Sequence, residues 1–193
     1  MRFLKSPSLV AVLAALAITL LSFGPVAYAA TVTGRITVQT SFDYVSALDL
    51  VTANVPLQRS VPITFTSGTG SGQVNEIWTD ERTITSSSSE SLDLAGSLTN
   101  AVGGTITFAT VKAIIIESAT ANTVDITVGN AASNGFTGPF GGATHTVAVR
   151  PGGVAMFVAP KTGWTVTAST GDLLKVAAGA ADITYRITII GTV

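Results

Sequence analysis

The sequence predicts an all-β protein, an antiparallel β-sandwich or jelly-roll-like single domain after an N-terminal signal peptide. Segments in which apolar and polar residues alternate recur along the chain, and glycine-rich turns separate them. No convincing helical pattern follows the first thirty residues. Strands spaced by roughly 8 to 12 residues with turn signals between them are typical of sandwiches and jelly rolls.

The first thirty residues have the anatomy of a secretory signal peptide. A short basic start precedes an apolar core from about Leu9 to Leu21, and Ala27-Tyr28-Ala29 fits the small-x-small pattern that a signal peptidase accepts. We expect cleavage after Ala29 or Ala30. The alternative is an uncleaved membrane anchor, but an apolar core of about 13 residues is shorter than the roughly 20 that span a bilayer.

Two stretches follow the signal peptide. Residues 31–60 are predicted to form an N-terminal strand and an irregular arm. The alternation is clear in Thr31–Phe42, where Ile36 and Val38 share a parity, whereas Asp43–Gln58 is the least readable part of the chain. That part could be an irregular edge, or an arm that becomes ordered only against a neighbour. Residues 61–193 are predicted to form the β-sandwich domain.

Within residues 61–193 the strand signals are frequent. Val61–Thr66 alternates, Thr105–Ala119 is a long apolar run rich in β-branched residues, and Asn122–Gly129 places Val124, Ile126 and Val128 on one face. Ser97–Gly104 could make one short helical turn. The remaining predicted strands lie in HTVAVR (145–150), GVAMFVAP (153–160), GWTVTAS (163–169), DLLKVAA (172–178) and ADITYRITII (181–190).

The stretch RPGGVAMFV predicts a tight turn between two strands. Arg150 ends one strand, Pro151 fixes its own φ angle, and Gly152 can adopt the positive φ that such turns require. We expect a hairpin here, with a buried strand in 154–160 that ends at Pro160, because proline has no N–H for a ladder.

The composition indicates a surface with few charges. Only 11% of residues are charged, against about a quarter in average proteins. Without the signal peptide the chain carries eight basic and eleven acidic residues, so its net charge is −3 and no nucleic-acid partner is expected. With no cysteine, an exported protein of this size must be stabilised by its core or by assembly with other chains.

Few residues could support catalysis, and no enzyme activity or cofactor is predicted. The chain has no cysteine and one histidine, so a Ser-His-Asp arrangement would have to use His145, and a site with several histidines for a metal ion is excluded. No Gly-x-Ser-x-Gly elbow occurs. His145 is therefore interpreted as an exposed strand or turn residue.

Two small clusters remain as candidate sites. Glu76 and Asp80 would share a face of a strand and could bind calcium, although a solvated strand with a local Asp80/Arg82 pair is the favoured interpretation. Trp78 and Trp164 could stack on a sugar, but aromatic residues of a small β domain are more often core or interface residues. The weak candidates for ligand or partner contact are Trp78, Phe136, Phe140 and Trp164.

From Asp80 to Gly191 the chain resembles a family of small β-rich structural proteins encoded in tailed-phage and prophage genomes, in which they are minor virion proteins. The resemblance rests on LDLAGSLTNAVG, ITFATVKAIII, ANTVDITVGNAASNGFTGPFG, VRPGGVAMFVAP, GWTVTASTGDLLKVA and the terminal ITYRITIIG. It implies a virion-associated role at the head or its surface and transfers no functional residues. The signal peptide departs from the family, because a tailed-phage head assembles in the cytoplasm.

The sequence therefore predicts a non-enzymatic structural protein that self-assembles or docks on a virion or surface lattice. Low charge, strands rich in serine and threonine, and the apolar ending ITIIGTV suit surfaces that neighbouring chains cover. The expected location is extracellular or at the cell surface, or in the virion if a virus encodes the protein. The alternative is a secreted β-sandwich module that binds a carbohydrate or another protein.

Overall fold

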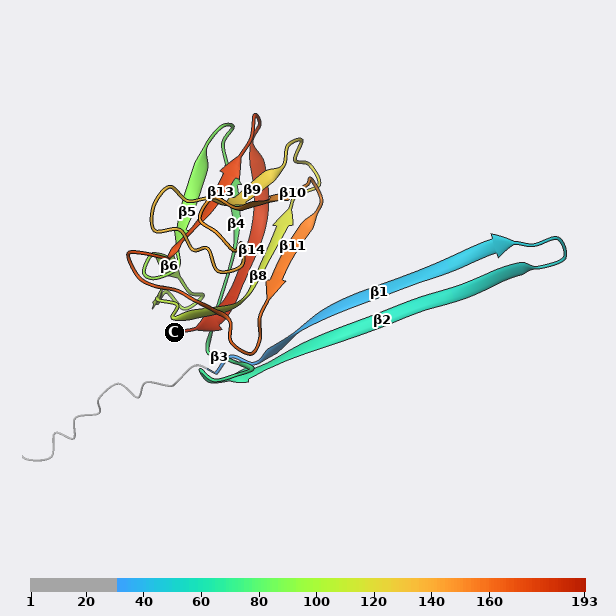
Figure 1. Ribbon diagram of the computed structural model, residues 1–193, viewed down its shortest axis with the longest axis horizontal. Coiled ribbons are helices and arrows are strands. Elements are labelled where there is room, and N and C mark those ends of the chain that lie inside the picture. Colours follow the sequence, from blue (N-terminus) through green and yellow to red (C-terminus); the bar gives the residue numbers. More distant parts are fainter. Residues whose placement is uncertain (1–30) are drawn as a thin grey trace, which may run out of the picture. The chain divides into compact units, whose positions relative to one another are not determined.

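The computed structural model describes residues 31–193, so the expected signal peptide lies outside the described residues. Within this range the chain is all-β and contains no helix, which confirms the predicted fold class (Figure 1). Residues 31–193 accordingly hold no helix with the length and hydropathy that crossing a bilayer demands. The strands are β1 (Gly34–Ala47), β2 (Thr52–Ser67), β3 (Gln73–Val74), β4 (Glu76–Ile84), β5 (Ser89–Asp93), β6 (Leu98–Thr99), β7 (Thr105–Ile106), β8 (Thr110–Ser118), β9 (Ile126–Gly129), β10 (Thr146–Val149), β11 (Val154–Val158), β12 (Trp164–Thr165), β13 (Leu173–Ala178) and β14 (Ile183–Thr192).

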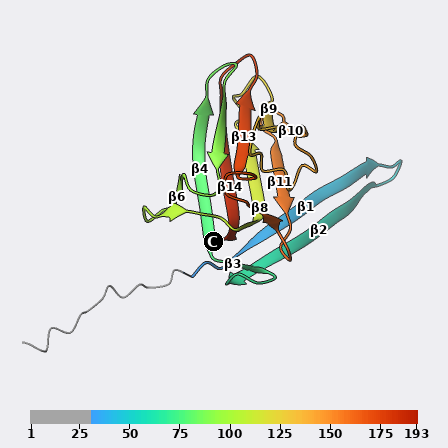
Figure 2. The same cartoon turned by 60° about the vertical axis from the view of Figure 1, so that its left-hand side comes forward.

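Two antiparallel sheets form the body of the protein. The four-stranded sheet has the order β10-β9-β13-β5, and the five-stranded sheet has the order β11-β8-β14-β4 with the short β12 paired to β8. The eight strands of these two orders can be numbered 1 to 8 along the chain as β4, β5, β8, β9, β10, β11, β13 and β14. The four-stranded sheet then has the order 5-4-7-2, and the five-stranded sheet has the order 6-3-8-1. This is the strand order of a double-sheet jelly roll. Figure 2 shows β4, β14, β8 and β11 together in one layer.

The hydrophobic core lies between the two sheets. Alternate residues of each strand point inward, and most of these are β-branched or leucine, which suits a pleated, buried surface. Because Ile114, Ile116 and Tyr185 point inward, their neighbours Ile115, Glu117 and Arg186 lie on the outer face of the five-stranded sheet. Fully buried members of the core include Ile114, Ile116, Ile126, Leu174, Val176, Tyr185, Ile187 and Ile189.

Residues 34–67 form a long, regular hairpin, which differs from the irregular arm expected in residues 43–58. The two strands pair continuously from Gly34–Phe65 to Ala47–Thr52, and β2 runs across the expected domain boundary at residue 60. Only the base of the hairpin is buried. There Phe65, with Ile36 and Ile63 beside it, joins a second apolar cluster that includes Val74, Ala113 and Ile190.

The turn at residues 150–153 forms as expected, but it does not close a hairpin. The Gly153 N–H donates to the Arg150 carbonyl at 2.8 Å, and Gly152 has a φ of 70°. The flanking strands, however, belong to different sheets, since β10 pairs with β9 and β11 pairs with β8. The turn is therefore a corner between the two layers, and β11 is a half-exposed edge strand in place of the expected buried one.

The helical turn considered for Ser97–Gly104 is also absent. Leu98 and Thr99 form β6, and the following turn closes where the Gly103 N–H donates to the Asn100 carbonyl at 3.0 Å. The Asn100 side chain accepts hydrogen bonds from the N–H groups of Val102 and Gly104 and so satisfies the turn locally. Asparagine favours such local turns over a helix.

Candidate functional site

The four aromatic residues considered for ligand contact belong to the core or pack against it. Trp78 and Phe136 are only 6% and 3% exposed. Phe140 and Trp164 are half-buried, and Phe140 meets Phe157 edge to face with ring centroids 5.6 Å apart. Side chains placed in this way stabilise the sandwich, and Trp78 and Phe136 are too deeply buried for a sugar to stack on them.

His145 lies on the surface just before β10. Its Nδ1 is 3.0 Å from the Phe140 carbonyl oxygen, which fixes the ring against its own loop. Within residues 31–193, no carboxylate forms an ion pair or a hydrogen bond with this histidine. A general base oriented by an acid, as the hydrolase hypothesis requires, is thus not assembled around His145 in this structure.

Glu76 and Asp80 lie four residues apart on β4, as expected, but each has its own partners. The Glu76 carboxylate accepts hydrogen bonds from the Ile77 N–H and the Asn100 amide. Asp80 pairs with Arg82 at 2.8 Å. In the part of the chain that the structure describes, no three His, Cys, Asp or Glu side chains converge on a common point.

A partly buried polar network connects the two sheets. The Tyr185 hydroxyl donates to Glu90 Oε1 at 2.7 Å, and the Arg82 guanidinium binds the other Glu90 oxygen at 2.6 Å and Asp80 at 2.8 Å. Burial, followed by the hydrogen bond to Glu90, raises the pKa of Tyr185 above its ordinary value. The hydrogen bond to Glu90 is the main cause that raises the pKa of Arg82, against the opposing effect of burial. Because Arg82 on β4 and Tyr185 on β14 both bind Glu90 on β5, the network connects these three strands.

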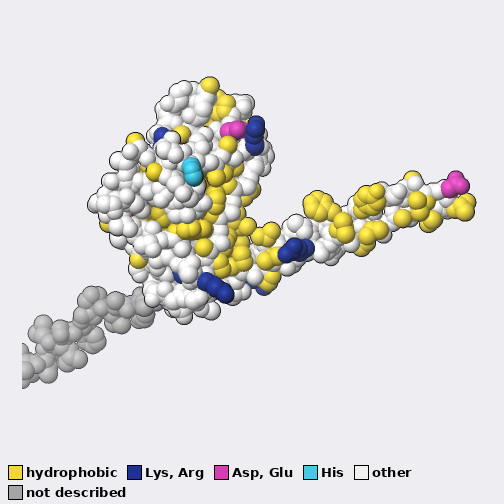
Figure 3. Space-filling view, viewed as in Figure 1, with side chains coloured by type: hydrophobic (Ala, Val, Ile, Leu, Met, Phe, Trp, Pro, Cys, Tyr) yellow, Lys and Arg dark blue, Asp and Glu magenta, His cyan; other side chains and the backbone are white. Residues whose placement is uncertain are grey.

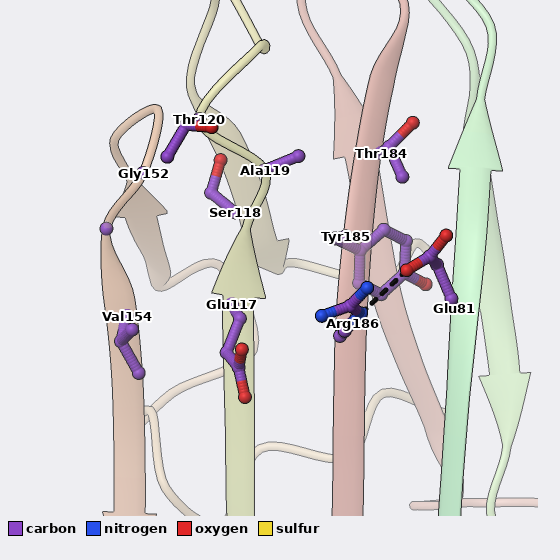
Figure 4. A pocket seen from close by; sticks show the side chains of 11 residues that line it. Glu81, Glu117, Ser118, Ala119, Thr120, Gly152, Val154, Thr184, Tyr185 and Arg186 are labelled. Carbon is purple, nitrogen blue, oxygen red and sulfur yellow. Dashed lines mark hydrogen bonds and ion pairs between the residues drawn. The ribbon is translucent and has the colours of Figure 1, made fainter.

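A hollow opens on the outer face of the five-stranded sheet, where β8 ends and β11 and β14 begin (Figure 4). Its volume is about 380 Å³, and its lining includes Ala119, Gly152 and Val154. Arg186 is directed toward Glu81, with Nε 2.6 Å from the carboxylate oxygen. Glu117 stands on the neighbouring strand and is exposed, and no ion pair to it forms within residues 31–193.

The outer part of the β1–β2 hairpin, residues 38–61, exposes many large hydrophobic side chains. We call this part the arm. Cross-strand partners share a face of the ribbon, and one face combines Phe42 with Leu57 and Tyr44 with Val55. These side chains are exposed, with 68% for Phe42 and 57% for Leu57. Figure 3 shows hydrophobic side chains along the whole arm. The opposite face pairs polar residues, such as Gln39 with Ser60 and Ser41 with Gln58.

An isolated two-stranded hairpin is at best marginally stable in water, and exposed apolar patches of this extent mark interaction sites. The arm is therefore the candidate functional site. The sequence analysis considered an arm in residues 43–58 as one alternative, but it did not predict the regular hairpin or its apolar face. The usable signal was the continued alternation at Phe42 and Tyr44, mirrored by Val55 and Leu57 across the turn.

The outer edge of β2 is protected against pairing with another strand. The Thr66 N–H points away from β1 and donates to the Gly72 carbonyl, so residues of the same parity direct their backbone nitrogens outward. Pro56 and Pro62 have this parity, and neither has an N–H to offer. The apolar face of the arm is consequently a better surface for binding than the β2 edge.

Comparison with known proteins found no matching family model, no similar curated protein and no similar solved structure.

Proposed function

We propose that this chain is a non-enzymatic structural subunit, exported or carried in a virion, that assembles with copies of itself or docks on a surface lattice. The observation that supports the proposal is the arm, whose exposed apolar face extends from Val38 to Tyr44 and from Val55 to Val61 and is interrupted by the Thr40–Arg59 pair. Burying that face would stabilise an assembly by roughly 25 cal/mol for each Å² of apolar surface removed from water.

The composition and the fold support the same proposal. A surface poor in charge and rich in serine and threonine provides little repulsion between copies. Double-sheet jelly rolls are used in viral capsids and also in lectins and cupins, so the fold by itself does not decide among these functions. Because Trp78 and Phe136 are buried, these two residues give the carbohydrate-binding alternative no support.

Light scattering after size-exclusion chromatography tests the proposal. The protein from the full-length gene is compared with a Phe42→Ser/Leu57→Ser variant, in which the paired residues of the apolar face become polar. We expect the wild type to form oligomers and the variant to associate roughly 100-fold more weakly, because buried apolar anchors dominate interface energies.

The neighbouring pair provides a matched control. Ser41 and Gln58 are paired on the opposite face, so Ser41→Ala/Gln58→Ala alters the ribbon to a similar extent without changing the apolar face. This control should associate like the wild type. A wild-type protein that stays monomeric at high concentration and retains no partner from virions or cell envelopes would contradict the proposal.

A further inference from the structure

Three chemically different cross-strand pairs follow one another along the apolar face of the arm. Cross-strand pairs follow one another every two residues, about 7 Å apart along the ribbon. An aliphatic pair comes first, a pair with the only cation of this face comes second, and an aromatic-aliphatic pair comes third. In this order the pairs are Val38 with Val61, Thr40 with Arg59, and Phe42 with Leu57.

The outer face of the five-stranded sheet carries a matching order beside its free edge. An apolar pair is followed by a pair with an exposed carboxylate, and then by the hollow at the end of the sheet. Along each strand, successive features of this order are again two residues apart. In this order the features are Ile115 with Met156, Glu117 with Val154, and the hollow lined by Ala119 and Gly152. We call these residues the receiving face.

We propose that the arm of one copy binds the receiving face of a second copy, with Arg59 on Glu117 and the side chain of Phe42 or Leu57 in the hollow. This inference rests on the proposed function and specifies its contact. Aliphatic side chains would lie on Ile115 and Met156, the charges would meet, and the bulky pair would fill the hollow. The two surfaces have the same spacing because both are built from β-strands.

The charges favour this partner over the alternatives. Within residues 31–193, neither Arg59 nor Glu117 forms an ion pair, whereas the nearby Glu81 is already bound to Arg186. A lipid bilayer would leave Arg59 without a carboxylate in the middle of the apolar face. Two arms packed face to face about the Thr40–Arg59 pair would bring two copies of the same cation together, which is unfavourable when they are desolvated, and any other register would leave Arg59 without a carboxylate on the facing arm surface.

Within one copy, the apolar face of the hairpin already packs on the outer face of the five-stranded sheet. At the base of the hairpin, Ile36, Ile63 and Phe65 already pack on Ala113 and Ile190 of the five-stranded sheet. Ala113 and Ile190 lie on the same outer face as the receiving face, two residues before Ile115 on β8. The proposed contact therefore repeats, between copies, a packing that the arm's own base makes.

The area is sufficient when two copies bind each other reciprocally. The ten arm residues of β1, 38–47, extend over about 34 Å, and two strands are about 10 Å wide. One contact then covers at most roughly 340 Å² on each partner, or about 700 Å² in total, which is below the roughly 1,000 Å² that a specific interface needs. Two reciprocal contacts would reach about 1,400 Å², which lies within the range of specific interfaces.

Charge exchange tests the contact by light scattering on the protein from the full-length gene. Arg59→Glu and Glu117→Arg should each weaken self-association by roughly 10- to 100-fold, and the double variant should recover most of the loss. If both single variants associate like the wild type, the proposed contact is wrong while the assembly itself remains. If the wild type is monomeric, the proposed function has failed, and this contact fails with it.

Crosslinking identifies the partner surface directly, since the chain contains no cysteine. Leu57→Cys and Ala119→Cys proteins, whose substituted residues meet at the hollow in the proposed contact, are mixed and treated with a short bis-maleimide. We expect a crosslink between the two variants, and little when Gln58→Cys on the polar face replaces Leu57→Cys. Crosslinking of Leu57→Cys only with itself, or flotation of the wild type with phosphatidylcholine and phosphatidylglycerol vesicles in place of self-association, would overturn the proposal.

Discussion

Gly152 shows how a single residue fixes the path of the chain between the two sheets. Its φ of 70° lies in the left-handed region, and a Cβ at this position would approach Thr120 Cγ2 to 3.3 Å. A type II turn favours proline at its second position and requires a positive φ at its third, and Pro151 and Gly152 occupy these two positions. Both requirements are local, which is why Pro151-Gly152 was predictable from the sequence.

Gly152→Val should therefore lower the free energy of unfolding by about 2 kcal/mol, because a β-branched residue is strained at positive φ. His145→Ala should change it by less than about 0.5 kcal/mol, since that side chain is exposed and bonded only to its own loop. Urea unfolding of both variants measures the difference. An equal loss of stability in the two would contradict the role assigned to the turn.

Tyr185 should give the protein a characteristic alkaline response. Burial and the hydrogen bond to Glu90 raise its pKa, so the native state keeps a proton that the unfolded chain loses above about pH 10. The stabilisation is thus complete below pH 10 and decreases as the pH rises beyond it.

Unfolding measured between pH 9 and pH 12 checks this expectation. The free energy of unfolding of the wild type should fall more steeply than that of Tyr185→Phe, by up to about 1.4 kcal/mol for each pH unit. The Tyr185→Phe variant is less stable at neutral pH but lacks this contribution to the slope. Parallel slopes for the two proteins would show that Tyr185 does not hold its proton in the native state.

At the scale of single elements, strands with one clear face were predictable and the arm was not. Ile126 and Val128 of β9 are fully buried, as their alternation predicts. In the arm the same alternation is interrupted by the Thr40–Arg59 pair, and Pro56 and Pro62 weaken the strand signal of β2. These prolines are tolerated because their nitrogens face away from β1, a property that depends on register and not on local sequence.

β11 illustrates a second limit of local patterns. Its residues Val154 and Met156 look like core residues in the sequence, yet they are exposed at the edge of the five-stranded sheet. Whether an apolar strand is central or at an edge depends on the pairing of distant segments. In the proposed contact the arm of a second copy would cover these side chains, which explains why an exposed edge strand carries apolar residues.

At the scale of the whole molecule, the fold class followed from strand spacing and turn residues, whereas the strand order did not. The jelly roll brings β14 from the end of the chain between β4 and β8, a pairing set by the collective burial of both sheets. The four aromatic candidates follow the same logic, because the enclosed core took Trp78 and Phe136 out of reach of a ligand. The β1–β2 hairpin lies largely outside that core, and the proposed function assigns the contact with a neighbour to it.

The claim that assembly buries the arm is tested most directly by hydrogen exchange at increasing protein concentration. A free two-stranded ribbon opens readily, so its amides exchange rapidly in the monomer. We predict that the inward-bonded amides of residues 38–44 and 55–61 become protected as the concentration rises, while the β8 and β14 core amides are protected throughout. Rapid exchange in the arm at every concentration, including those at which oligomers form, would contradict the claim.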